Sequence, residues 1–377
     1  MDSYGRVEVA LNLEEPDRVP LFEMHISTWI AKELLGREPV AYNTPLIMNL
    51  MSKGRAPNLN RAIAEDLEEL TLKVGLDFLR VPHGQNPGIQ VKKAGESRWL
   101  IDGGSYVWTS GTLWREDWGF QREVEAESLI EALKSRIEAY EEGEDEAAFQ
   151  VLRTLAERLK GKLFLTFDSD GSWGPIVSNP PLLRAVLKWM YTDPELVRRI
   201  INLYTDLAIQ MGVQALEEGA DAILMCVDYG YSKGPWMSPN HFKSFVKPAL
   251  ERQCRAFKGA GGYAILHSDG NIWPILGDVV EAGVDAYQGI DVEAGMDLAE
   301  VKANYGDRLC LIGNVHPATI DFEEPDAVLA EVRRCIGQAA SGGGYVLSSS
   351  ANISVNKNSG NFILMLEAAR RIGRYSP

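Results

Sequence analysis

The strongest constraint on the fold of this chain is an alternation, repeated eight times, of a short apolar run with a longer segment of helical periodicity. The runs are rich in β-branched and aromatic residues, as buried strands are, and the longer segments carry apolar residues at three- and four-residue spacing. Strand followed by helix, eight times over, predicts a parallel (β/α)8 barrel of the α/β class. The expected strands are residues 18–26, 77–83, 162–170, 222–230, 263–270, 286–291, 310–315 and 344–350.

Helices are expected between and beyond these strands. Ser238 followed by Pro239 has the pattern of a helix N-cap and first helical residue. We expect one barrel domain over residues 1–377, with a helical extension at its N-terminus. The clearest helical segments are residues 58–75, 194–218, 239–258, 324–340 and 358–373.

Two segments depart from the simple alternation. Residues 89–120 alternate apolar with polar side chains and contain Gly-Gly and Ser-Gly turns, which predicts a β-hairpin or small antiparallel sheet inserted after the second strand. Such an insertion would form a lid or part of the barrel rim. Residues 122–160 are charged and helical, and we expect a helical excursion there.

Composition excludes several classes of partner. Of the residues, 45% are hydrophobic and 24% charged, without a run of about 18 apolar residues, so we expect a globular protein with no membrane span. With 38 basic against 53 acidic residues and no Lys/Arg stripe, nucleic acid is not an expected partner. Acidic residues run through the first twenty positions, so we expect no signal peptide and a cytoplasmic location. Cys226, Cys254, Cys310 and Cys335 form no C-x-x-C pair and are expected to be reduced thiols.

Polar residues gather at the expected carboxyl ends of the strands. In a barrel of this kind that rim carries the chemistry, because it receives a loop from every strand. Any single Asp there could equally cap a helix, but a cluster of acids and imidazoles without a use would cost desolvation free energy. We therefore expect a functional site among Glu23, His25, Arg80, His83, Asp168, Asp170, Asp228, Tyr229, His267, Asp269, Gln288, Asp291, Asn314, His316, Ser348, Ser349 and Ser350.

The stretch YAILHSDGN, residues 263–271, brings a histidine and a carboxylate to one strand end. His267 and Asp269 are two residues apart, so their side chains point to the same side of a strand. They could share a divalent metal ion, zinc being usual for imidazole and oxygen ligands. Alternatively, the carboxylate could hold the imidazole tautomer for acid/base catalysis. The chain has no H-x-x-x-H or H-E-x-x-H motif, so spacing alone leaves both readings open.

Several motifs follow one another in order along nearly the whole chain. They are LNLEEPDRVPLFEMHI (11–26), GLDFLRVP (75–82), VDYGYSKGPWMSPNHFKSFVKPAL (227–250), ILHSDGNIWPILGDVVEAGVDAYQGID (265–291), LIGNV (311–315) and GGYVLSSSANI (343–353). Together they resemble the uroporphyrinogen decarboxylase superfamily. The resemblance implies a barrel fold and one of two chemistries. One branch comprises metal-free decarboxylases of haem synthesis. The other comprises methyltransferases that exchange methyl groups between small compounds and the cobalt of a separate corrinoid protein.

The chain departs from the motifs of both branches. The decarboxylases grip a tetrapyrrole with arginines in an R-Q-A-G-R type loop, whereas FEMHISTWIAKELLGREPV here has no arginine pair, and Glu23, Asp168, Asp170 and Asp228 would repel a polycarboxylate. Thiol-methylating relatives hold zinc with His-x-Cys and a later Cys; the matching positions here are His267, Asp269 and residues 348–350, all serine. Oxygen ligands would make a bound zinc more Lewis-acidic, suited to an ether or hydroxyl oxygen, or the metal is absent.

We therefore expect a methyltransferase that activates a small methoxylated or methylated donor and delivers the methyl group to a corrinoid (cobalamin) protein. The resemblance also implies a homodimer. Trp108, Trp114, Trp118 and Trp173 are candidates for an aromatic pocket. The expected catalytic residues are His267, Asp269, Asp228, Glu23 and His25; zinc would be held by His267 and Asp269; substrate would contact Arg80, His83, Asp168, Asp170, Tyr229, Gln288, Asn314 and Trp173.

Two other functions stay open. A metal-free decarboxylase would use Asp228 or Asp168 to stabilise a protonated intermediate and His267 as the acid, with Arg80 and Lys233 binding the substrate carboxylate. A non-catalytic binding protein would have kept the barrel and lost the metal-binding cysteines. The polar strand ends argue against it.

Overall fold

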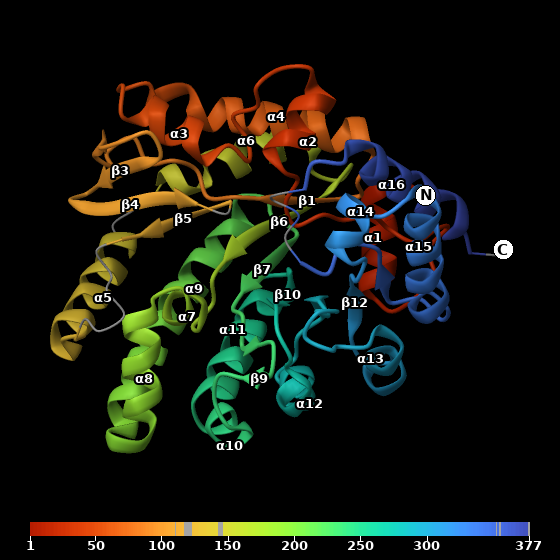
Figure 1. The fold of residues 1–377 in the computed structure, drawn as a ribbon. Coiled ribbons are helices and arrows are strands. Elements are labelled where there is room, and N and C mark those ends of the chain that lie inside the picture. The colour runs from red at the N-terminus through yellow and green to blue at the C-terminus, as the bar shows by residue number, and fades with distance from the viewer. Residues whose placement is uncertain (110, 117–122, 142–145, 352, 354–355, 376–377) are drawn as a thin grey trace.

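A curled, seven-stranded parallel sheet forms the centre of the computed structural model, which describes residues 1–109, 111–116, 123–141, 146–351, 353 and 356–375 (Figure 1). The strands lie side by side in chain order, as successive β-α-β crossovers produce. They are β1 (Phe78–Val81), β6 (Phe164–Ser169), β7 (Ala222–Cys226), β10 (Tyr263–Ser268), β11 (Ala286–Gly289), β12 (Cys310–Ile312) and β13 (Tyr345–Val346). All seven fall within strands expected from the sequence.

The expected first strand, residues 18–26, is not a regular strand. Leu21 makes an isolated parallel bridge with Leu347, just beyond β13. On the other side, the Leu21 carbonyl accepts a 2.9 Å hydrogen bond from the amide of Asp77, just before β1. Pro20 lacks the N–H that a continuous ladder would need, so pairing is intermittent. The segment nevertheless lies between β13 and β1.

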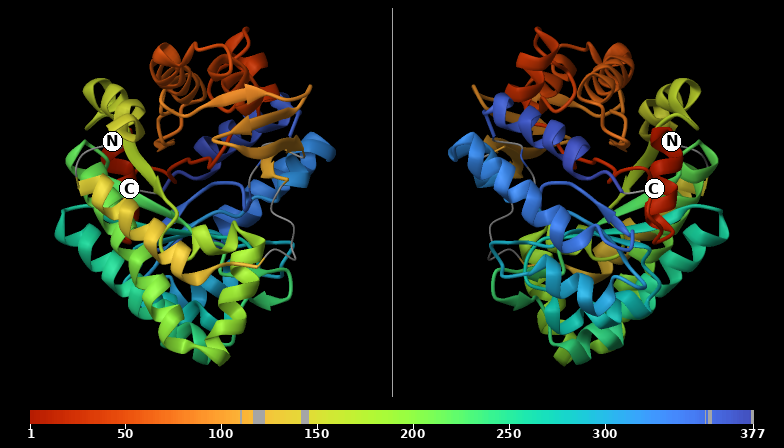
Figure 2. Two further views of the ribbon diagram at one scale, coloured as in Figure 1. Left: turned by 90° about the vertical axis from the view of Figure 1, so that its left-hand side faces the viewer. Right: turned by 90° about the vertical axis from the view of Figure 1, so that its right-hand side faces the viewer.

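Helices cover the outer face of the curled sheet (Figure 2). None of those in the described ranges is long and apolar enough to cross a membrane. Their bounds are α1 (Ser3–Leu11), α2 (Thr28–Leu35), α3 (Thr44–Met51), α4 (Leu59–Val74), α5 (Ala126–Glu141), α6 (Gln150–Leu159), α7 (Gly174–Val177), α8 (Pro180–Thr192), α9 (Pro194–Glu217), α10 (Pro239–His241), α11 (Lys247–Gly259), α12 (Trp273–Glu281), α13 (Leu298–Tyr305), α14 (Pro317–Phe322), α15 (Pro325–Ala339) and α16 (Ser359–Ile372), with short 3₁₀ turns at Ala56–Asn58 and Glu146–Phe149.

The helix expected over residues 239–258 is interrupted. A π-helical turn, Phe242–Val246, separates α10 from α11. Pro248, in the first turn of α11, has no N–H to donate to the carbonyl four residues back, and the backbone widens there.

Residues 91–115 form a separate antiparallel sheet. Its strands, in order, are β2 (Val91–Lys93), β3 (Arg98–Ile101), β4 (Gly104–Thr109) and β5 (Thr112–Arg115). Trp99 is fully buried on one face, whereas Trp114 is half exposed. A two-stranded ribbon, β8 (Gly230–Tyr231) and β9 (Gly234–Pro235), follows β7.

The interior of the curled sheet changes from apolar to polar along its strands. Phe78, Leu224 and Ile265 belong to an apolar cluster inside the sheet. Because side chains alternate with a period of two, the next inward positions lie two residues further on. These residues, Arg80, Cys226, His267 and Gln288, are polar and lie at the carboxyl ends of β1, β7, β10 and β11. The fold therefore gathers polar groups at one end of the sheet.

Candidate functional site

The ends of β7 and β10 bring one imidazole and two carboxylates together. Asp228, His267 and Asp269 each offer a ligand atom, and these atoms all lie within 4.8 Å of one another. His267 Nε2 is 3.5 Å from Asp228 Oδ1 and 3.9 Å from Asp269 Oδ2. The structure thus joins His267 and Asp269, expected as a pair, to Asp228 from the neighbouring strand.

A glycine allows the two loops to approach so closely. Gly270 has a φ of +83°, and a Cβ atom there would lie 2.4 Å from the carbonyl carbon of Gly230. Any side chain at this position would push the loop after β10 away from the loop after β7. A 2.9 Å hydrogen bond from the Asp269 amide to Asp228 Oδ1 joins the loops directly. The carboxylates are therefore positioned by backbone as well as by side-chain contacts.

Gln288 sets the orientation of the His267 ring. The Gln288 Nε2 group donates a 3.1 Å hydrogen bond to the Ser349 carbonyl, so its Oε1 faces His267 Nδ1. An oxygen at that place requires the proton of a neutral imidazole on Nδ1. The lone pair on Nε2 then points toward Asp228 and Asp269, which is the tautomer that binds metal ions.

Glu23 contacts Ser349, the residue to which Gln288 donates its hydrogen bond. It is only 2% exposed and accepts hydrogen bonds from the amide (3.0 Å) and hydroxyl (2.6 Å) of Ser349. Burial raises the pKa of Glu23 to about 7, although the Ser349 hydrogen bonds oppose the shift. Glu23 was expected among the catalytic residues, and the structure connects it to His267 through Ser349 and Gln288.

The three-residue cluster fits a divalent cation. Burial raises the pKa of Asp269 to about 6, with Asp228 adding to the shift and His267 opposing it. Asp269 Oδ1 is buried and has no hydrogen-bond partner among the described residues. A bound cation would satisfy this oxygen and offset the repulsion between the carboxylates. One imidazole nitrogen with carboxylate oxygens is a donor set that zinc accepts.

A second polar group lies across the sheet end, at β1 and β6. Arg80 donates to both oxygens of Asp168, through Nε at 2.8 Å and Nη2 at 2.7 Å. Its Nη1 reaches the Met24 carbonyl at 3.2 Å, and a ring nitrogen of His83 lies 2.7 Å from the Asp168 carbonyl oxygen. The Arg80 charge is therefore balanced by Asp168 within the protein.

His25 belongs to this second group rather than to the three-residue cluster. With Tyr42, Arg80 and His83 it lines a cavity of about 210 Å³. Burial lowers the pKa of His25 to about 3, and the nearby Arg80 charge adds to the effect. The imidazole is neutral there, so it would act as a hydrogen-bonding group in this cavity.

A larger cavity, of about 520 Å³, reaches the three-residue cluster. Tyr106 and Trp114 of the antiparallel sheet line one side, Val177 and Pro180 line the other, and Asp228 lies at its edge. The inserted sheet thus covers a space into which the Asp228 carboxylate is partly exposed. A ligand held there could reach the cluster through Asp228.

The tryptophans that were candidates for an aromatic pocket lie in different environments. Trp114 lines the large cavity. Trp108 is partly buried and packs against the hydrophobic core. Trp173 is fully buried in that core, so the structure does not place it at the substrate contact expected from the sequence. Trp118 lies outside the described residues.

Several other expected substrate contacts serve the fold instead. Tyr229 is fully buried, and its ring packs 5.1 Å from that of Phe242. Asn314 is also buried and donates to the Ile290 carbonyl at 3.0 Å. Sequence reasoning placed them at the site because they follow strands, but a residue at a strand end can face the surrounding helices.

Asp291 and His316 organise loops. Asp291 accepts a 2.9 Å hydrogen bond from the amide of Gly270, and so supports the loop that carries Asp269. His316 accepts a 3.0 Å hydrogen bond from the Ala318 amide at the start of α14. The His316 contact is typical of a helix-capping side chain.

Cys226 lies among the polar residues at the end of the sheet, although the sequence analysis treats it only as one of four reduced thiols. It points toward the inside of the curled sheet, pairs in register with His267, and has its sulfur 3.8 Å from Arg80 Nη2. Burial raises the pKa of this thiol. The other three cysteines are buried, whereas Cys226 is partly accessible. The sequence signal for this location is that Cys226 ends a strand and precedes Asp228 by two residues, unlike the other three cysteines.

Comparisons with known proteins agree on the family. Residues 139–372 match the family model described as uroporphyrinogen decarboxylase (URO-D). The chain is 28% identical over 179 residues to a uroporphyrinogen decarboxylase from Ralstonia nicotianae, across 45% of this chain and 46% of that one. The relative from Methylibium petroleiphilum is 26% identical over 199 residues, 51% of each chain. The chain thus matches about half the length of these curated relatives.

A solved structure shares the fold over its whole length. A methyltransferase from Methanosarcina mazei aligns with 98% of this chain and 99% of its own, with a TM-score of 0.68 and 19% sequence identity. At that identity, the likeness establishes a common architecture.

Proposed function

Because the chain belongs to the uroporphyrinogen decarboxylase family, we propose that it is a methyltransferase that takes a methyl group from a small methoxylated or methylated compound and passes it to a corrinoid protein. The observation that carries this proposal is the cluster of Asp228, His267 and Asp269 beside the cavity of about 520 Å³. The barrel, closed by residues 18–26, would hold this cluster at its mouth, with the antiparallel sheet as a lid. A homodimer stays a prediction from the family resemblance.

The cluster is suited to activating an oxygen. Asp228, His267 and Asp269 would hold a zinc ion, which supplies Lewis acidity toward an ether or hydroxyl oxygen. Gln288 would keep the His267 Nε2 lone pair available by holding the proton on Nδ1. Removal of a methyl group from an ether needs such activation, because an alkoxide is a poor leaving group.

The remaining residues would bind and shield the donor. Trp114 and Tyr106 offer aromatic surface to its apolar part, and the antiparallel sheet excludes water from one side of the cavity. The corrinoid partner, implied by the family resemblance, would supply the nucleophilic cobalt.

A decarboxylase is the second candidate. The curated relatives carry that name, and Glu23 and Asp269 both have a pKa raised close to neutrality, as an acid that protonates a carbanion requires. Two features weigh against it. Arg80 is held by both oxygens of Asp168, and the segment after residue 22 lacks the arginine pair that would grip a polycarboxylate.

The experiment that tests the proposal begins with bound metal. Purified wild type and His267→Ala are compared by elemental analysis, with His241→Ala, on α10, as a histidine control. We expect about one zinc per chain in the wild type and in the control, and loss of zinc from His267→Ala. Methoxylated aromatic compounds and methanol are then offered with reduced cobalamin, and methylcobalamin formation is followed by absorbance.

Methylcobalamin formation that depends on zinc and on His267 would support the proposal. A metal-free protein that releases carbon dioxide from uroporphyrinogen would support the decarboxylase instead. A protein that binds zinc and turns over neither class of compound would contradict both.

A further inference from the structure

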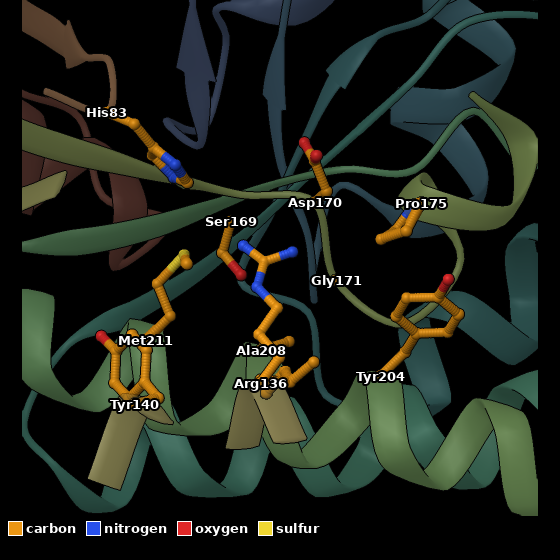
Figure 3. A pocket seen from close by; sticks show the side chains of 11 residues that line it. His83, Arg136, Tyr140, Ser169, Asp170, Gly171, Pro175, Tyr204, Ala208 and Met211 are labelled. Carbon is orange, nitrogen blue, oxygen red and sulfur yellow. The ribbon is translucent and has the colours of Figure 1, made fainter. Parts of the chain in front are cut away.

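A small cavity beside the barrel mouth is separate from the cluster of Asp228, His267 and Asp269. It has a volume of about 90 Å³ and lies between the end of β6 and helices α5 and α9 (Figure 3). Asp170 follows β6, Arg136 comes from α5, and Tyr204 comes from α9. His83 lines both this cavity and the one that contains His25.

Opposite charges face this cavity without pairing. Arg136 and Asp170 both line the cavity; in Figure 3 the Arg136 guanidinium extends from α5 toward Ser169 and Asp170, and the Asp170 carboxylate points away from it. Both side chains are exposed, and neither forms an ion pair or a side-chain hydrogen bond with any residue in the described part of the chain. The protein around the Asp170 carboxyl group desolvates it and raises its pKa, and the charges of His83, Arg80 and Arg136 oppose this shift. Burial raises the pKa of Tyr204 to about 12, and the Arg136 charge opposes that shift.

The turn that presents Asp170 depends on glycine. A Cβ atom on Gly174 would lie 2.5 Å from the Cys226 carbonyl oxygen and 2.7 Å from the Asp170 Cβ. The Gly174 amide instead donates a 2.9 Å hydrogen bond to the Asp170 carbonyl. Gly171 adopts a φ of +58° in the same turn. These contacts hold the Asp170 backbone against β7, where Asp170 lines the cavity.

We propose that this cavity binds a small zwitterion of the amino-acid class. The ligand carboxylate would pair with Arg136 and accept a hydrogen bond from the Tyr204 hydroxyl, and its ammonium group would pair with Asp170. A simple anion would be attracted by Arg136 and repelled by Asp170, and a simple cation would be attracted by Asp170 and repelled by Arg136. Each would therefore bind less tightly than a zwitterion.

The size of the cavity agrees with such a ligand. A cavity of about 90 Å³ is well above the roughly 10–15 Å³ that holds one water molecule, so it has room for a small solute. Glycine and its N-methyl derivative are of suitable size, and the exposure of Arg136 and Asp170 leaves an open side through which a longer substituent could project. The site is independent of the proposed methyl transfer, because it includes none of the three residues of the metal-binding cluster.

The test compares ligands of matched size and different charge. Glycine, sarcosine, acetate and methylammonium are titrated into the full-length protein by calorimetry at constant ionic strength. We expect glycine or sarcosine to bind at least about tenfold more tightly than acetate or methylammonium. Binding should raise the melting temperature in proportion to the logarithm of ligand concentration.

Variants assign the binding to the two charges. Arg136→Gln and Asp170→Asn should each weaken zwitterion binding about tenfold or more. Lys134→Gln removes an exposed cation from the same helix and should leave binding unchanged. Zinc content should be unaffected by all three changes, so failure of this proposal is distinguishable from failure of the proposed function.

Two results would overturn the inference. Acetate that binds as tightly as glycine, and is insensitive to Asp170→Asn, would show a plain anion site. No binding of any of the four compounds by the wild-type protein would show that Arg136 and Asp170 are not a ligand site.

Discussion

Asp228 accepts a 2.9 Å hydrogen bond from the backbone amide of Asp269, and so the carboxyl ends of β7 and β10 act as one unit. The same carboxylate oxygen lies 3.5 Å from His267 Nε2. A backbone donor and an imidazole thus share one oxygen of Asp228. The arrangement positions the acids before any ligand arrives, which lowers the entropy lost on binding.

The first prediction concerns the close approach of the two loops. Gly270→Ala adds a Cβ atom where φ is +83° and the Gly230 carbonyl carbon would be 2.4 Å away. Gly103→Ala is a matched control, because Gly103 has a φ of +82° with open space around it. We expect the control to cost about 1–2 kcal/mol of unfolding free energy and to keep zinc affinity. Gly270→Ala should cost more and should weaken zinc binding, measured by competition with a chromogenic chelator.

The second prediction concerns the tautomer of His267. Gln288→Leu removes the oxygen that faces Nδ1, whereas Gln288→Glu keeps an oxygen there and loses the donor to the Ser349 carbonyl. We expect Gln288→Leu to lower zinc affinity about 10- to 100-fold. Gln288→Glu should retain most of it. Equal losses in the two variants would contradict the orienting role of Gln288, since a structural role alone would not distinguish them.

The third prediction is a pH dependence of stability that arises from Glu23. Its pKa is about 7 in the folded protein against an ordinary value of 4.5, so the folded state holds the proton more tightly than the unfolded state does. The resulting stability is complete below pH 4.5 and is lost as the pH rises through 7. Glu23→Gln mimics the protonated form and removes this dependence.

Urea unfolding at several pH values measures the effect. The free energy of unfolding of Glu23→Gln, relative to wild type, should increase by about 3 kcal/mol or less between pH 5 and pH 8. Taking the difference between the two proteins cancels the contributions of other groups, such as Asp221, whose pKa burial also raises. A constant difference over this range would exclude a titrating Glu23.

The fourth prediction concerns the connection between residues 18–26 and β1. Asp77 is fully buried and accepts hydrogen bonds from Arg6 (2.7 Å), Arg18 (2.7 Å) and the Leu21 amide (2.9 Å). Asp77→Ala leaves Arg18 without its acidic partner and Arg6 with Asp17 alone, and we expect it to lower the free energy of unfolding by about 3–5 kcal/mol. Asp307→Ala, an exposed control, should change it by about 0.5 kcal/mol or less. A small effect at Asp77 would show that this network is dispensable.

The strands were largely predictable from the sequence because each is buried on both faces. Such strands form continuous apolar runs that end where polar residues begin, as Phe164–Ser169 and Tyr263–Ser268 do. Residues 18–26 have the same apolar character, but Pro20 and the contacts of Asp77 interrupt their ladder. The pattern of apolar residues indicates which side chains are buried, but it does not show whether the backbone forms continuous strand hydrogen bonds.

The candidate site was predictable only in part. His267 and Asp269 were paired by their spacing, and the structure added Asp228 from the adjacent strand. Gln288 lies at the end of β11, where a substrate contact was expected, yet its amide faces His267. Trp173 resembled a pocket residue and is part of the core. Which way a residue near a strand end points depends on the twist of the sheet and on packing against helices.

The amino-acid sequence by itself determined the class of fold and the end of the sheet at which polar groups collect. Both follow from local hydrophobic patterning, because buried strands and amphipathic helices carry their own periodicities. Only the tertiary structure decided which polar groups meet. Asp228 and Asp269 are far apart in the chain, and Arg136 and Asp170 come from different elements. Their proximity depends on the register between β7 and β10 and on the packing of α5 and α9, which no local pattern encodes.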